Sequence, residues 1–135
     1  MAAPALRVEG LRAGYGATTG LHGVSLEVAR GDIVAIIGAN GVGKTTFLRA
    51  VSGLLPPSAG EIYLEGDRTT AVPAEELVPR GVAHIPEGRQ LFSGLTVRHN
   101  LLMGAFARRQ RAAVAQDLGR VLELFPELRP LLDRQ

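Results

Sequence analysis

An apolar run followed at once by a glycine-rich octapeptide constrains this chain more than any other feature. The run, residues 33–37, reads I-V-A-I-I, which is typical of a strand buried on both faces of a sheet. The octapeptide, residues 38–45, reads G-A-N-G-V-G-K-T and matches the pattern G-x-x-x-x-G-K-[ST] in full. Residues 44–52 favour a helix, with Gly53 as its C-cap. The sequence therefore predicts a strand, a tight loop and a helix in direct succession.

Each residue type in the octapeptide suits a loop that holds a phosphate. Glycines at 38, 41 and 43 let backbone N–H groups approach the anion, where a Cβ would obstruct it. The helix that follows adds unpaired N–H groups and a partial positive charge. Lys44 is positioned to reach terminal phosphates, and the hydroxyl of Thr45 is an oxygen ligand of the kind that Mg²⁺ prefers. The alternative is a glycine-rich turn with an incidental lysine, and the flanking strand and helix favour nucleotide binding over it.

The octapeptide alone does not distinguish ATP from GTP. GTPases read guanine with an N-K-x-D element, which cannot occur in a chain whose single lysine is Lys44. Tyr15 lies in a turn-rich stretch, residues 14–20, and offers a flat ring on which adenine can stack. The same ring can instead be a partly buried anchor of its loop, so Tyr15 has two interpretations at this point.

Composition excludes several other classes of protein. Fifteen Lys and Arg against thirteen Asp and Glu give a net charge of +2. The nearest approach to a basic cluster is Arg108, Arg109 and Arg111, which we interpret as a solvated helix face rather than a nucleic-acid interface. The lack of cysteine excludes disulfides and thiolate metal sites. No apolar run reaches the ~20 residues that span a bilayer, and residues 1–7 do not resemble a signal peptide. We therefore expect a cytoplasmic protein with no nucleic-acid partner.

Short strands alternate with helices along the rest of the chain. The patterns predict strands at residues 6–9, 23–28, 60–64 and 82–85, and helices at about residues 73–80, 96–108 and 112–125. This alternation favours an α/β fold.

Three stretches together resemble the ATP-binding subunits of ABC transporters. They are I-G-A-N-G-V-G-K-T-T at 37–46, G-V-A-H-I-P-E-G-R at 81–89, and L-T-V at 95–97 leading to N-L-L-M-G at 100–104. The first contains the Walker A motif of P-loop NTPases. The other two narrow the resemblance to ABC proteins, and within them to the subunits that drive uptake of branched-chain amino acids.

The resemblance covers essentially the whole chain and implies its fold. It implies an α/β P-loop NTPase, with a RecA-like core and an N-terminal antiparallel β subdomain. Residues 1–135 would be the N-terminal portion of one ABC ATPase domain, incomplete and ending in the start of the helical subdomain. The strand at 33–37 would then have an open flank.

The resemblance also implies roles for individual residues. Tyr15 takes the position of the adenine-stacking aromatic residue. The phosphates would be bound by Gly38, Asn40, Gly41, Gly43, Lys44, Thr45 and Thr46. Mg²⁺ would be held by Thr45 and by Glu87, which stands where most ABC proteins carry the glutamine of the Q-loop. Glutamate is usual there in this subgroup, and the alternative for Glu87 is a solvated loop residue.

The three histidines carry weaker signals. His99 departs from the family pattern, in which glutamate is commoner before the asparagine. It is either a neutral substitution on an exposed helix face or a change in the contact with the membrane subunit. His22 and His84 lack the spacing of a metal site or a catalytic triad, and we interpret both as structural.

Parts of the family's catalytic machinery have no counterpart in this sequence. The L-S-G-G-Q-type signature, the apolar strand that ends in Asp-Glu and supplies the base, and the switch histidine are all absent. We therefore predict no catalytic residue in this chain. Because phosphoryl transfer depends on positioning and charge stabilisation, we expect weak ATP binding and almost no hydrolysis.

The function that the resemblance implies is that of an ATPase subunit of an ABC importer. ATP binding and hydrolysis would close a dimer with a second ATP-binding subunit and drive transmembrane permease subunits. The solute would be a branched-chain or related amino acid, and the protein would be peripheral at the inner face of the plasma membrane. The loop after Glu87 and the helix near 96–108 would contact the permease.

Two alternatives belong to other classes. One is a non-catalytic nucleotide-binding or interaction fragment, which the missing motifs favour. The other is an unrelated P-loop kinase, which the stretches at 81–89 and 95–104 disfavour.

Overall fold

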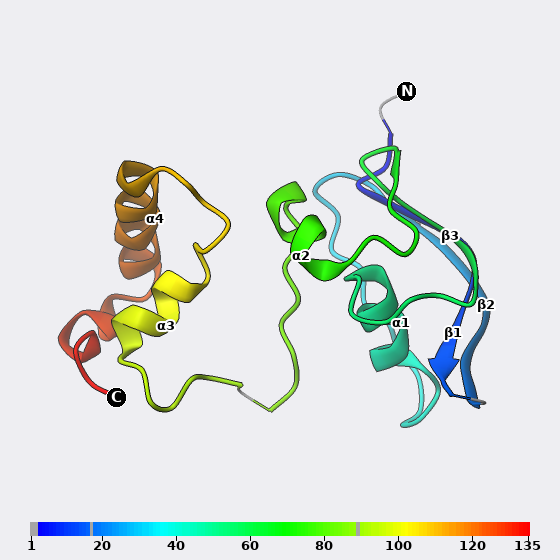
Figure 1. Ribbon diagram of the computed structural model, residues 1–135, viewed down its shortest axis with the longest axis horizontal. Helices are drawn as coiled ribbons and strands as arrows, with labels where there is room; N and C mark the ends of the chain where they lie inside the picture. Colours follow the sequence, from blue (N-terminus) through cyan, green and yellow to red (C-terminus); the bar gives the residue numbers. More distant parts are fainter. Residues whose placement is uncertain (1–2, 17, 89) are drawn as a thin grey trace. The chain divides into compact units, whose positions relative to one another are not determined.

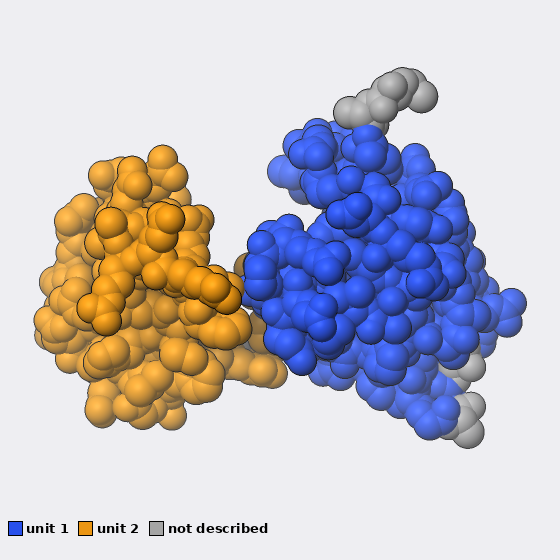
Figure 2. Space-filling model, turned by 45° about the horizontal axis from the view of Figure 1, so that its top comes forward, with its two compact units in different colours: residues 1–84 blue, residues 85–135 orange. Residues whose placement is uncertain are grey.

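The chain forms two compact units. The computed structural model describes residues 3–16, 18–88 and 90–135. Unit 1 is Met1–His84 and unit 2 is Ile85–Gln135 (Figure 1, Figure 2). Unit 1 contains a β-sheet and short helices, whereas the described part of unit 2 contains helices.

The sheet of unit 1 has four antiparallel strands in the order β2-β1-β3-β4. The strands are β1 (Leu6–Tyr15), β2 (Thr18–Val28), β3 (Ala59–Leu64) and β4 (Asp67–Arg68). In the centre of the sheet, Val8 of β1 pairs with Leu26 on one side and with Ile62 on the other. The strands predicted at 6–9, 23–28 and 60–64 are thus confirmed as parts of longer strands.

The turn-rich stretch at 14–20 is a hairpin rather than a loop. β1 continues to Tyr15 and β2 begins at Thr18, which pairs with it. Gly16 has a φ of 58°, and glycine adopts this left-handed conformation without steric cost. A turn this short lets both strands run to its edge, and β-branched threonine suits the strand. Ala17 lies outside the described residues.

One face of the sheet packs against helix α1 (Lys44–Val51), and this contact forms the core. Val8, Leu11 and Ala13 of β1 are buried together with Leu21, Ile62, Phe47 and Ala50. The pairing register shifts between Val8 and Leu11, where Gly10 has a φ of 57°. Such a bulge adds a residue, so that side chains three positions apart both point into the core.

The predicted helices of unit 1 are confirmed, with small changes at their ends. α1 begins at Lys44 as expected and ends at Val51, with Ser52 as the C-cap. The predicted C-cap, Gly53, instead lies one position beyond the C-cap and has a φ of 73°. The helix predicted at 73–80 is α2 (Ala74–Leu77) continued by the 3₁₀ turn η1 (Val78–Arg80).

The surface of the sheet carries one well-ordered charge cluster. Arg68 donates hydrogen bonds to Glu61 across the β3–β4 hairpin, and the hydroxyl of Thr70 donates another at 2.6 Å. The Arg68 guanidinium and the Thr70 hydroxyl hold the pKa of the Glu61 carboxyl below its usual value. Arg68 is exposed and Glu61 and Thr70 are only partly buried, so the cluster fixes the hairpin without adding much stability.

The strands predicted at 33–37 and 82–85 are wrong at the level of secondary structure. Both segments lie outside the four strands of the described sheet. Ile33 is 99% exposed and Ile37 is 91% exposed. A strand buried on both faces needs neighbouring strands to bond its backbone. The described strands pair with one another and none pairs with these segments. The apolar side chains of these two segments therefore suggest a buried strand, but the described residues contain no strand that pairs with either segment.

Unit 2 contains α3 (Val97–Met103), α4 (Arg111–Leu124) and the 3₁₀ helix η2 (Pro126–Leu131). Thr96 caps α3 as its hydroxyl accepts a hydrogen bond from the His99 N–H. α3 ends at Met103 with Gly104 as its C-cap, five residues before the predicted end at 108. α4 matches the predicted helix at 112–125 to within one residue at each end.

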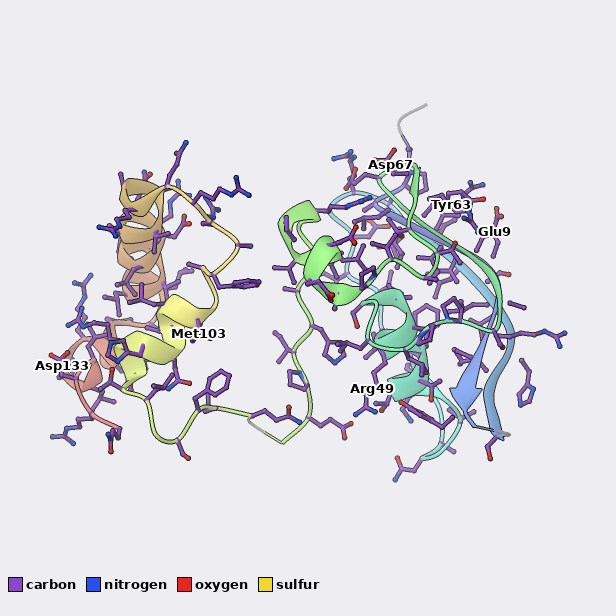
Figure 3. All side chains as sticks on the ribbon, in the orientation of Figure 1. Glu9, Arg49, Tyr63, Asp67, Met103 and Asp133 are labelled. Carbon is purple, nitrogen blue, oxygen red and sulfur yellow. The ribbon has the colours of Figure 1, made fainter. Side chains whose placement is uncertain are left out.

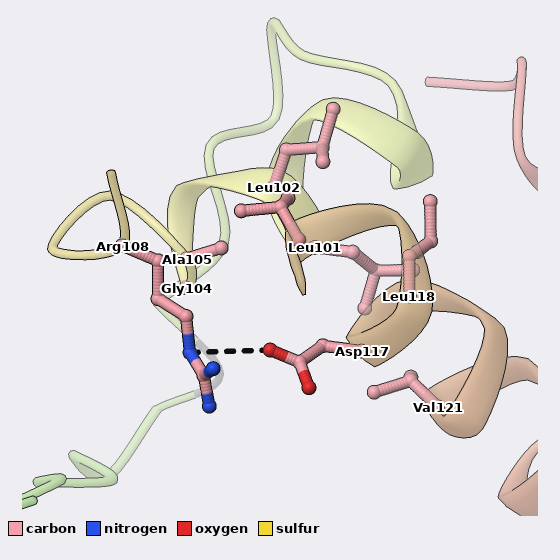
Figure 4. Close-up of a pocket in the computed structure, with 9 residues that line it drawn as sticks. Leu101, Leu102, Gly104, Ala105, Arg108, Asp117, Leu118 and Val121 are labelled. Atoms are coloured by element: carbon pink, nitrogen blue, oxygen red, sulfur yellow. Dashed lines mark ion pairs between the residues drawn. The ribbon is translucent and has the colours of Figure 1, made fainter. Parts of the chain in front are cut away.

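A hollow of about 320 Å³ lies between α3 and α4 (Figure 4). Apolar side chains such as Leu101, Leu118 and Val121 line it, and Arg108 forms an ion pair with Asp117 at 3.1 Å beside it. Within the described residues, no helix has the length and apolarity needed to cross a membrane.

We expect the exposed isoleucines to make the chain self-associate, because bare apolar surface favours association. Replacing Ile33 and Ile37 together by serine should lower the weight-average mass in sedimentation velocity. The control is Leu54→Ser, since Leu54 lies in the same unit and is 54% exposed. A monomeric unsubstituted chain, or an equal effect of the control, would contradict the prediction.

Candidate functional site

The glycine-rich loop between residues 37 and 44 has two positions whose backbone conformation only glycine adopts easily. Gly41 and Gly43 have φ values of 83° and 104°, in the region that L-residues rarely adopt. A Cβ at Gly43 would lie 2.4 Å from the carbonyl oxygen of Gly20. The loop therefore lies directly against the start of β2, and glycine at 43 permits that approach.

The loop leads directly into the N-terminus of α1. Gly43 is the N-cap and has no side chain to accept hydrogen bonds from the first N–H groups of the helix. The backbone ladder begins with the Phe47 N–H donating to the Gly43 carbonyl at 2.8 Å. The first turn of α1 holds no acidic residue. The unpaired N–H groups and the helix dipole therefore favour an anion at this end.

The ammonium group of Lys44 lies over the loop. It donates hydrogen bonds to the carbonyl oxygens of Gly38 at 2.6 Å and Ala39 at 2.8 Å. These bonds connect the two ends of the loop. Neither acceptor is a carboxylate, so they leave the positive charge of Lys44 unneutralised.

The two threonines that follow Lys44 are in different environments. Thr45 is exposed, so its hydroxyl is accessible to a ligand. Thr46 is only 9% exposed, and its hydroxyl lies 3.1 Å from the position that a Cβ on Gly20 would take. The Thr46 side chain thus packs the base of the loop against β2. We therefore expect Thr46 to interact with an anion through its backbone N–H and not through its buried hydroxyl.

Tyr15 lies in the same unit as the loop, at the end of β1. The residue is 51% exposed, and its hydroxyl accepts a hydrogen bond from the Arg49 guanidinium at 2.9 Å. Arg49 belongs to α1, the helix that also carries Lys44. Both interpretations of Tyr15 fit these facts, because the ring is anchored at its tip and still has an exposed surface.

Glu87 belongs to the other unit and is exposed. Arg89, two positions later and the last residue of the G-V-A-H-I-P-E-G-R stretch, lies outside the described residues. In the part of the chain that is described, no three His, Asp or Glu side chains group as a metal site would require. The loop and Tyr15 thus come together in unit 1, and Glu87 is part of unit 2.

The structure gives Asn100 a role that the sequence did not assign to it. Its side-chain oxygen accepts a bond from the Phe92 N–H at 3.0 Å, and its amide nitrogen donates to the Phe92 and Thr96 carbonyls at 3.1 Å each. Asn100 therefore holds the turn that precedes α3. The fixed spacing of threonine and asparagine in T-V-x-x-N-L was the available signal.

Two of the histidines have structural contacts. The Nδ1 atom of His84 lies 3.2 Å from the Ser52 hydroxyl at the end of α1. The Nδ1 atom of His99 lies 3.0 Å from the hydroxyl of Thr96 and adds to the cap of α3.

Comparison with known proteins identifies the family. The model of the ABC transporter family matches residues 21–129. The chain belongs to the ABC transporter family. This confirms the resemblance found in the glycine-rich loop and the two stretches after it.

Curated relatives of this ABC chain are similar over most of its length. It is 43% identical over 115 residues to the "High-affinity branched-chain amino acid transport ATP-binding protein BraG" of Pseudomonas aeruginosa, covering 85% of this chain and 49% of that protein. It is 32% identical over 130 residues to the "Probable branched-chain amino acid transport ATP-binding protein LivF" of Archaeoglobus fulgidus, covering 96% and 55%. The ABC chain thus spans about half the length of these relatives.

A solved structure confirms the fold class. The "ATP binding subunit of ABC transporter" superposes with a TM-score of 0.79 at 35% identity, covering 95% of this chain and 52% of that one. The fold is therefore a partial α/β P-loop NTPase fold, in which the N-terminal antiparallel sheet is formed.

The contact between Gly43 and Gly20 predicts the effect of adding a methyl group. Gly43→Ala should lower the free energy of unfolding by about 3 kcal/mol, because a positive φ and a steric clash add up. Tyrosine fluorescence during urea unfolding reports on unit 1, which contains both tyrosines of this tryptophan-free chain.

The matched control for this change is Gly81→Ala. Gly81 has a φ of 94°, and a Cβ there would meet nothing within 4 Å, so we expect a loss of about 1 kcal/mol. Equal losses for the two variants would show that the close approach to β2 is unimportant.

Proposed function

We propose that this chain binds ATP, with the phosphates held by the glycine-rich loop and the start of α1. The observation that carries the proposal is the position of the Lys44 ammonium over a loop that ends in an uncapped helix N-terminus. A cation on a flexible stem and a set of backbone N–H donors then face the same small region. The groups that would contact phosphate are the N–H groups and side chains of Gly38, Asn40, Gly41, Gly43, Lys44, Thr45 and Thr46.

We propose that the adenine base stacks on Tyr15. Aromatic faces stack well on flat rings, and about half of this residue is exposed. The base and the phosphates would then be bound by neighbouring elements of one unit, β1 and α1.

A magnesium ion fits the loop through Thr45, whose hydroxyl is exposed in the first turn of α1. Mg²⁺ keeps most of its ligands as phosphate oxygens and water, so a single hydroxyl from this unit is chemically adequate. When bound, it neutralises charge on the phosphates. We propose Glu87 as a second protein ligand, because a carboxylate is also a hard oxygen donor.

We further propose that residues 1–135 are the N-terminal portion of one ABC ATPase domain, from the Walker A motif to the first helices of the helical subdomain. The full protein would be a transport-coupled ATPase, peripheral at the inner face of the plasma membrane. It would pair with a second ATP-binding subunit and drive permease subunits that import branched-chain or related amino acids. The similarity to BraG and LivF supports this choice of solute.

A second candidate function is that of a non-catalytic nucleotide-binding or interaction fragment. A reading frame that continues beyond Gln135 into both motifs would support the transporter subunit, and a stop codon would support the fragment.

The Lys44→Ala variant tests the proposed site. Removing one charged donor from a phosphate should weaken ATP binding by about ten- to a hundredfold, measured by calorimetry in the presence of Mg²⁺. The urea midpoint should stay close to that of the unsubstituted chain, because the hydrogen bonds of this side chain within the described residues go to carbonyls of its own loop.

Arg80→Ala is the control for this variant, since it removes an exposed cation of the same unit. It should leave the affinity for ATP unchanged. An unaltered dissociation constant in Lys44→Ala would refute the assignment of the loop.

We also expect the 135-residue chain to hydrolyse ATP barely above the uncatalysed rate. Positioning of phosphate and Mg²⁺ remains, but no base or signature residue aligns the attacking water. A phosphate-release assay on the chain checks this, with full-length BraG as the comparison. Turnover at the level of the comparison protein would show that these residues hold the complete machinery.

A further inference from the structure

We propose that Arg49 is a positioning residue that fixes the ring of Tyr15 for binding the adenine base. This inference rests on the proposed binding of ATP. A contact between α1 and the end of β1 would then strengthen the binding of the base without affecting the binding of the phosphates.

The contact joins two side chains far apart in the sequence. The Nη1 atom of Arg49 donates to the Tyr15 hydroxyl oxygen at 2.9 Å. Arg49 lies in the last turn of α1, and Figure 3 labels its side chain. Tyr15 is the last residue of β1 and is followed by the Gly16 turn.

The local structure explains why Tyr15 needs this bond. Tyr15 is 51% exposed, so packing covers only about half of the residue. A ring at the edge of a hairpin can rotate about two side-chain torsions. A hydrogen bond at its tip removes most of that freedom before a ligand arrives, which is preorganisation. The planar guanidinium of arginine is well suited to hold one orientation.

The same helix would thus orient both ends of the nucleotide. Lys44 opens α1 at the phosphate loop, and Arg49 follows five residues later, about 7.5 Å along the helix axis. Because Arg49 bonds to the hydroxyl at the tip of the ring, this bond does not cover either face of the ring. Arg49 therefore need not contact the nucleotide to affect its binding.

The proposal predicts that Arg49 affects the base and leaves the phosphates alone. Arg49→Met should weaken ATP binding by about two- to fivefold, up to the effect of one hydrogen bond. Binding of tripolyphosphate, which has no base, should not change. A merely structural role would weaken both ligands together. Calorimetry with each ligand in the presence of Mg²⁺ measures the difference.

Three further variants test whether Arg49 acts through its hydrogen bond to Tyr15. Tyr15→Phe keeps the ring but removes the hydroxyl, so it should match Arg49→Met, and the double variant should be no weaker than either. Arg49→Lys restores a donor and should recover part of the affinity. Arg80→Met removes an exposed cation of the same unit and should change nothing.

A spectroscopic measurement tests the contact without ATP. In a Tyr63→Phe background Tyr15 is the only tyrosine, and the chain has no tryptophan. Arg49→Met should increase the quenching of Tyr15 fluorescence by acrylamide, because the released ring is more mobile.

The outcomes separate the two proposals. If the unsubstituted chain binds neither ATP nor tripolyphosphate, the proposed function fails and this inference fails with it. If both ligands bind and Arg49→Met leaves ATP unchanged, weakens both ligands alike, or leaves Tyr15 quenching unaltered, the proposed function stands and the role of Arg49 is wrong.

Discussion

The packing of α1 against one face of the antiparallel sheet is the interaction on which the rest of unit 1 depends. Phe47 and Ala50 of the helix are buried against Leu11 and Ile62 of the strands. This burial fixes the start of the helix, and with it the loop that leads into Lys44. The geometry of the glycine-rich loop is therefore a consequence of an apolar contact, since no polar group of the loop contributes to that core.

The same helix, α1, contacts both parts of the candidate site. Its N-terminus presents N–H groups and the Lys44 ammonium, while its last turn holds Tyr15 through Arg49. A short helix can do this because its residues are rigidly related to one another. The strand hairpin contributes the ring, and the approach of Gly43 to Gly20 keeps the hairpin and the loop together.

Local sequence patterns predicted structure reliably where the backbone hydrogen bonds form within the same segment, as they do in helices. The helices α1, α3 and α4 follow from residue type and spacing, although α3 ends five residues before its predicted end. The pattern was misleading at residues 33–37, where β-branched side chains predicted a buried strand. Strand formation depends on partners distant in the sequence, and the described chain offers this segment none.

By itself the sequence determined the family and the glycine-rich loop, and it supplied the residues proposed to contact phosphate, because each depends on residue types at fixed spacing. Only the tertiary structure decided that residues 14–20 form a hairpin, that Asn100 holds the turn before α3, and that Arg49 bonds to Tyr15. These features join side chains brought together by folding. Spacing along the chain carries no information about a hydrogen bond between residues 34 positions apart.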